Sequence, residues 1–71
     1  MYRILYKKVY GTEKEAIADL KKIKEIVSDP KIQKGSVPNS FLIVLYESKS
    51  KDRIEEGIRY YRQRNLTVFR G

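Results

Sequence analysis

The chain has 71 residues, with 16 Lys and Arg against 9 Asp and Glu, and a formal net charge of +7. This length predicts a single domain over residues 1–71, and the surplus of positive charge favours phosphate-rich or acidic partners. The absence of His and Cys excludes a His general base, a thiolate nucleophile, a zinc site of the usual ligands and a disulfide framework. A small domain without Cys or a long apolar segment is expected in the cytoplasm and not in a membrane.

The first predicted element is a strand over residues 2–10, which Gly11 ends. A helix is expected next, over residues 13–28, because Thr12 and Glu15 have the spacing of a capping box. One stripe of this helix is apolar and is expected to face the core, while the opposite side carries charged residues. The stripe consists of Ala16, Leu20, Ile23 and Val27.

Asp29 and Pro30 stop this helix, since proline lacks a backbone N–H and disfavours a helical residue before it. Residues 31–37 are expected to form a weak, charged edge strand; the alternative is a loop, but long structureless loops are uncommon in compact domains. Residues 41–46 read FLIVLY and show no polar alternation, so a strand here needs apolar cover on both faces. Helices on one side of the sheet would leave the other face open for a partner.

A second helix is expected to begin after its cap and to run to about residue 64, with Gly57 placed so that the helix approaches the sheet closely. Two residues are suited to cap it: Ser50 and Asp52. Its inward stripe consists of Ile54, Ile58 and Tyr61. Asn65 is suited to the left-handed conformation that ends a helix, and residues 66–70 then predict a last strand.

The predicted order is therefore strand, helix, weak strand, strong strand, helix, strand. This order resembles the ferredoxin-like βαββαβ two-layer sandwich, an α+β fold with both helices on one face of the sheet. The alternative omits the weak strand and gives a three-stranded parallel βαβαβ sheet. The resemblance covers the whole chain but rests on element order, without a sequence motif.

Basic residues follow the first strand and the second helix. In the ferredoxin-like order these two ends and the turn at residues 38–39 lie at the same end of the sheet, so four bases should gather there, with Arg59 one turn away. The four are Lys7, Lys8, Arg62 and Arg64. In the parallel alternative the first strand ends beside residues 48–51, where two helix N-termini form an anion site, but no glycine-rich phosphate loop accompanies it.

Tyr60 is the aromatic residue that the helical phase directs outward, between Glu56 and Arg64. Such spacing favours a local contact between the ring and the guanidinium group. Because Tyr is favoured where one side is buried and the other meets a partner, Tyr60 is also a candidate binding residue.

The acidic residues do not converge, because Asp19, Asp29 and Asp52 lie on separate segments, so neither catalysis, a metal nor a cofactor is expected. The sequence predicts a small basic protein that binds DNA or RNA phosphates with weak sequence preference and forms a homodimer through the open sheet face. The predicted binding residues are Lys7, Lys8, Arg59, Tyr60, Arg62 and Arg64. The alternative is a protein-interaction or regulatory module, of viral or plasmid origin, that uses the open apolar face.

Overall fold

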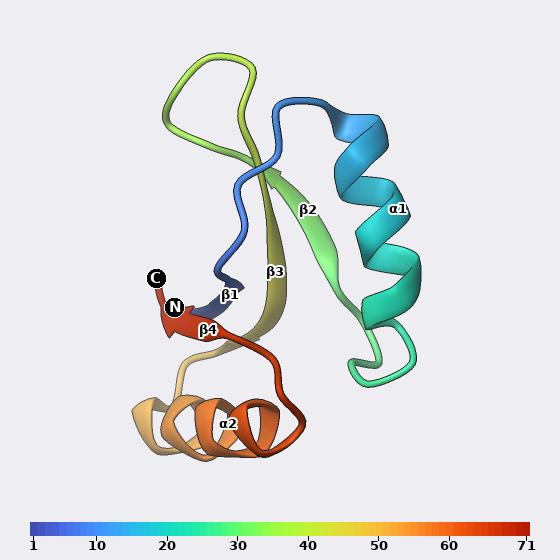
Figure 1. Ribbon diagram of the computed structural model, residues 1–71. Helices are drawn as coiled ribbons and strands as arrows, with labels where there is room; N and C mark the ends of the chain where they lie inside the picture. The colour runs from blue at the N-terminus through green and yellow to red at the C-terminus, as the bar shows by residue number, and fades with distance from the viewer.

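A computed structural model describes residues 1–71 and contains four strands and two helices in the order β-α-β-β-α-β (Figure 1). The elements are β1 (Tyr2–Tyr6), α1 (Glu13–Ile23), β2 (Lys31–Lys34), β3 (Phe41–Ser48), α2 (Lys51–Gln63) and β4 (Val68–Arg70). The sheet order is β2-β3-β1-β4, and every neighbouring pair is antiparallel. The chain is thus α+β, with a topology compatible with the ferredoxin-like arrangement. The parallel three-stranded alternative is wrong, because β2 forms and pairs with β3.

One apolar cluster forms the core and joins both helices to the same face of the sheet. Its members include Ala16, Ile23, Ile54 and Ile58 from the helices and Ile4, Ile43, Leu45 and Val68 from the strands. In Figure 1, α1 lies along β2 while α2 crosses the far end of β3. Accordingly, α1 contacts β2 and β3, whereas α2 contacts β1, β3 and β4. The helices divide the sheet between them rather than packing on each other.

A β-bulge in β3 turns two consecutive side chains toward the helices. Ile4 pairs with Tyr46 and the next residue, Leu5, pairs with Val44, so Leu45 is the extra residue. A bulge disrupts strict alternation and increases local twist. As a result, both Leu45 and Tyr46 face the helices: Leu45 lies in the core cluster and Tyr46 packs against it.

The first strand is shorter than the predicted 2–10, because the chain leaves the sheet after Tyr6. Lys7 N still donates to Thr67 O at 3.0 Å, but the next two residues form no strand. Tyr10 then rejoins the sheet as an isolated bridge to Phe41, with both backbone N–H···O distances at 2.9 Å. The alternating pattern therefore identified both paired ends but not the gap between them.

Helix α1 ends at Ile23 rather than at residue 28. The N–H groups of Glu25 and Ile26 donate to carbonyls three residues back, on Lys22 and Ile23. Such bonds tighten the last turn of a helix into 3₁₀ geometry. The predicted apolar stripe nevertheless continues through this turn, since Val27 is buried in the core cluster.

The remaining boundaries differ from the prediction by a few residues. Strand β2 ends at Lys34 rather than residue 37, because Gly35 N donates to Ser40 O and closes the turn toward β3. Strand β3 continues two residues past the predicted end, to Ser48, and β4 begins at Val68 rather than residue 66. These shifts leave the predicted element order intact.

Candidate nucleic-acid interface

Helix α2 carries most of the predicted binding residues, and its own sequence fixes how it sits. Ser50 is the N-cap, and its Oγ accepts a hydrogen bond from Arg53 N at 3.4 Å. Ile54, Ile58 and Tyr61 are buried against the sheet, as predicted. With about 3.6 residues per turn, the residues beside this stripe divide into two flanks. The flank toward the groove described next is called the groove flank and consists of Arg53, Glu56, Tyr60 and Arg64. The opposite flank is called the outer flank and consists of Glu55, Arg59 and Arg62.

An open groove lies between the groove flank and β3. It has a volume of about 480 Å³ and is lined by Tyr46, Arg53, Glu56, Gly57, Tyr60 and Tyr61. We call this site the tyrosine groove. It brings together Tyr46 of β3 with Tyr60 and Tyr61 of α2. The sequence alone did not indicate that these two elements meet at this point.

Gly57 forms the floor of the tyrosine groove and allows the helix to approach the sheet. A Cβ atom added at Gly57 would lie 2.7 Å from Ile4 Cδ1, closer than real side chains come. The same atom would lie 3.9 Å from both Tyr46 Cδ2 and Tyr61 Cε2. The predicted role of this glycine is confirmed, and its missing side chain also keeps the groove open.

Tyr60 is exposed, at 45% of its surface, and Arg64 covers one side of its ring. The Arg64 guanidinium carbon lies 3.6 Å from the ring centroid, and Arg64 Nη1 donates to Tyr60 O at 3.2 Å. The predicted ring–guanidinium contact is therefore present. Tyr61 meets Tyr60 edge-on, with ring centroids 5.4 Å apart and planes at 79°. Burial raises the pKa of Tyr61, so its hydroxyl stays neutral at physiological pH.

The arginines of α2 do not form one cluster. Arg53 and Arg64 lie on the groove flank, whereas Arg59 and Arg62 lie on the outer flank, beside β4. There, Arg70 Nη1 pairs with Glu55 Oε1 at 2.6 Å. All four α2 arginines are exposed and none of them forms an ion pair.

The two lysines after β1 are placed differently from the arginines. Lys7 lies beside the segment that follows α2, through its backbone bond to Thr67. Lys8 instead turns toward α1, where its Nζ lies 3.5 Å from Asp19 Oδ2 and 5.2 Å from the centroid of the Tyr10 ring. Neither lysine forms a hydrogen bond or ion pair with the α2 arginines. Figure 1 also places the turn at residues 38–39 at the opposite end of the molecule from α2, so the expectation that the turn and this helix share one end is wrong.

Lys8, Tyr10 and Asp19 form a polar cluster that the sequence analysis did not find. Tyr10 is buried and its hydroxyl donates to Asp19 Oδ2 at 2.7 Å. This hydrogen bond and, less strongly, the Lys8 charge hold the pKa of Asp19 below its usual value. Burial, followed by the bond to Asp19 and its charge, raises the pKa of Tyr10. Asp19 follows the buried Ala16 at helical spacing, which was the available signal that it lies near the sheet.

The sheet face opposite the helices is more covered than expected. Its central residues, Leu5 and Val44, are only 8% and 4% exposed, although they lie outside the core cluster. They pair with each other between Phe69 on β4 and Lys31 on β2, so one row of side chains crosses all four strands. The backbone of Gly71 also packs on Leu5. Neighbouring side chains and backbone therefore cover the middle of this face.

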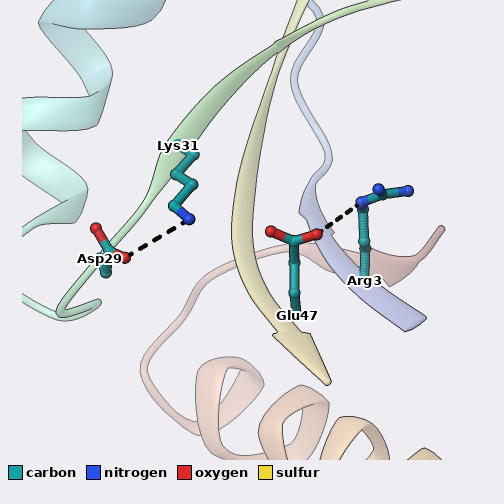
Figure 2. A network of polar contacts seen from close by, with 4 residues as sticks. All are labelled: Arg3, Asp29, Lys31 and Glu47. Carbon is teal, nitrogen blue, oxygen red and sulfur yellow. Dashed lines mark hydrogen bonds and ion pairs between the residues drawn. The ribbon is translucent and has the colours of Figure 1, made fainter. Parts of the chain in front are cut away.

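Charged pairs flank this row. Figure 2 shows Arg3 reaching from β1 to Glu47 on β3, and Lys31 turning back to Asp29 before β2. The distances are 3.0 Å from Arg3 Nε to Glu47 Oε2 and 3.9 Å from Lys31 Nζ to Asp29 Oδ2. The four side chains are between 30% and 82% exposed, so these pairs add little stability. They make the open face mixed rather than uniformly apolar.

No group of three or more acidic side chains gathers where it could hold a metal ion. Neither helix is long and apolar enough to cross a membrane. Comparisons with family models, with curated proteins and with solved structures found no match for this chain. The function is therefore inferred from the geometry of the surface.

Proposed function

We propose that this protein binds nucleic acid through phosphate contacts made by α2, with little sequence preference. The observation that carries the proposal is that Arg53, Arg59, Arg62 and Arg64 are all exposed on one helix and free of ion pairs. Arginine suits phosphate because its planar fork of donors matches the phosphate oxygens. The net charge of +7 further favours association with a polyanion.

The proposal includes all the predicted binding residues, but we expect them to contribute unequally to affinity. Arg59, Arg62 and Arg64 supply charge and Tyr60 supplies an aromatic surface, while Lys7 lies close enough to the end of α2 to extend the basic surface. Lys8 contributes less, because Asp19 neutralises it. We infer binding rather than catalysis, and a ferredoxin-like fold, which the strand order β2-β3-β1-β4 supports.

Fluorescence anisotropy tests the proposal, with labelled single- and double-stranded DNA and RNA titrated between about 50 and 200 mM salt. We expect affinity to fall steeply as salt rises. The variant Arg59→Glu with Arg62→Glu should lose most of the affinity, because two phosphate contacts become repulsive. The strand type that binds best identifies the class of ligand.

The matched control is Lys14→Glu with Lys21→Glu, which makes the same charge change at exposed positions on α1. If both double variants lose affinity equally, net charge alone drives binding and α2 is not the interface. If the wild-type protein does not bind at about 50 mM salt, where phosphate contacts are strong, the proposal is wrong.

A second candidate function is self-association through the open sheet face. The observation that favours it is an apolar hollow at one end of that face, lined by Val9, Val37 and Leu42 together with Gly35, Ser36 and Ser40. Val9 and Val37 are 61% and 66% exposed. Exposed apolar clusters of this kind mark interaction surfaces. The mass of the protein in solution tests this candidate.

A further inference from the structure

We propose that the tyrosine groove receives one unpaired base of a single-stranded nucleic acid, stacked against Tyr60. This inference rests on the proposed function and assigns it a strand type and a base-binding site. It is carried by the position of three tyrosines around Gly57, which has no side chain, next to arginines that form no ion pair.

Arg64 already occupies one face of the Tyr60 ring, so a base would use the other. Arg64 stacks on the ring at 3.6 Å but does not line the groove, whereas Tyr60 does. A base in the groove would extend the stack on the other side, and Arg64 would hold the ring in place. Arginine and aromatic planes form such stacks readily.

The groove has the size and lining of a small-ligand site. Its volume of about 480 Å³ lies within the range of about 300 to 1,000 Å³ typical of such sites. Tyr46 and Tyr61 form the apolar walls and Gly57 keeps the floor low. In a duplex the faces of the bases are already stacked, so only an unpaired base can insert its face here.

Charges at the groove match a nucleotide rather than an apolar side chain. Arg53 lines the groove and Arg64 lies just behind Tyr60, so the phosphates on either side of the stacked base meet positive charge. Glu56 is the one acidic residue in the lining. A carboxylate accepts hydrogen bonds from base amino groups, so Glu56 would favour bases that carry one, adenine, cytosine and guanine, over thymine or uracil.

The test compares two labelled strands of equal length and charge, one with bases and one with abasic sites throughout. Wild-type protein should bind the strand with bases about 5- to 150-fold more tightly, which is the usual effect of stacking one base on an aromatic side chain. Tyr60→Ala should abolish this difference, so that the variant binds both strands with equal affinity. Tyr60→Phe keeps the ring and should behave as wild type.

The matched control is Phe69→Ala, which removes an aromatic ring of similar exposure from the opposite face of the sheet. It should leave the preference for bases intact. If Phe69→Ala removes the preference and Tyr60→Ala does not, the sheet face stacks the base and this inference is wrong. Equal, salt-dependent affinity of the wild-type protein for both strands also overturns it, although phosphate binding by α2 would stand. If neither strand binds, the proposed function fails as well.

Discussion

The side chain of Tyr10 links the sheet to helix α1. Its ring is buried, and its hydroxyl donates to Asp19, which in turn lies 3.5 Å from Lys8. A hydrogen bond to a charged acceptor is stronger than a neutral one and is costly to break. Because Tyr10 also pairs with Phe41, this bond adds a directional contact between α1 and the sheet.

Removing the Tyr10 hydroxyl tests this role. Tyr10→Phe keeps the ring but leaves Asp19 with only water and Lys8, so we expect the free energy of unfolding at neutral pH to fall by about 1 kcal/mol. Urea denaturation measures the change. Tyr2→Phe is the control, since it removes an exposed hydroxyl with no hydrogen-bond partner and should have no effect. A loss no larger than that of the control would show that the bond contributes nothing.

The same pair predicts a pH dependence of stability. The folded pKa of Asp19 is lowered from 3.8, so its contribution is present above that value and is lost as pH falls through the folded pKa. The folded pKa of Tyr10 is raised from 10.0, so its contribution is present below that value and is lost as pH rises through the folded pKa. Urea denaturation should therefore show the largest difference between wild type and Tyr10→Phe from about pH 5 to pH 9, shrinking on both sides. A difference that is constant from acid to alkaline pH would contradict this.

At the scale of elements, local chemistry made the helix starts and the buried helix faces predictable, and the ends of α1 and of the strands less so. Caps and stripes act within one helix, so Thr12 and the buried faces followed from spacing, and Ser50 is one of the two caps that the sequence allowed. Asn65 adopts the predicted left-handed backbone, with φ of 63°. The bulge at Leu45 could not be predicted, because it depends on how β3 pairs with β1. Period-two alternation has no means of signalling an extra residue.

The contact between α2 and β1 depends on Gly57. For this reason we expect a substitution that helix propensity favours, glycine to alanine, to destabilise the protein. Alanine is normally better than glycine in a helix by about 1 kcal/mol, but here its Cβ would meet Ile4, which has no exposed surface. Overpacking a filled core costs about 1 to 3 kcal/mol. We therefore expect Gly57→Ala to lower the free energy of unfolding, as measured by urea denaturation.

A double-mutant cycle separates the clash from other effects. Ile4→Val removes the Cδ1 atom that the new Cβ would meet, at its own cost of about 0.5 to 1.5 kcal/mol. In that background Gly57→Ala should be neutral or stabilising, because only the gain in helix propensity remains. Stabilisation by Gly57→Ala in the wild-type background would show that the helix can move away from Ile4 without loss.

Over the whole molecule, the candidate site was only partly predictable. Tyr60 and Arg64 lie four residues apart on one helix, so their contact followed from the sequence. Tyr46 joined them only because the bulge turns it toward α2. Lys8 was expected beside the arginines, but it pairs with Asp19 because the chain bends between β1 and α1. Contacts between elements thus depend on pairing and bends that no periodicity encodes.

The α2 arginines and the apolar hollow lie at opposite ends of the molecule. Figure 1 places α2 at one end and the turn after β2 at the other, and Val9, Val37 and Leu42 share the hollow at that turn. A dimer formed through the hollow would leave both α2 helices facing away from the contact. Two binding sites on one strand raise the overall affinity without new contacts.

We therefore expect the protein to have twice its chain mass of 8.4 kDa in light scattering at micromolar concentration. Val37→Glu places a charge in the apolar contact and should give the monomer mass without loss of stability, since the side chain is largely exposed. Ile17→Glu, at an exposed position on α1, is the control and should leave the dimer intact. Val37→Glu should also weaken binding to long strands more than to short ones, because only long strands span two sites. A wild-type mass of one chain would rule out this arrangement and leave α2 as a single, independent binding surface.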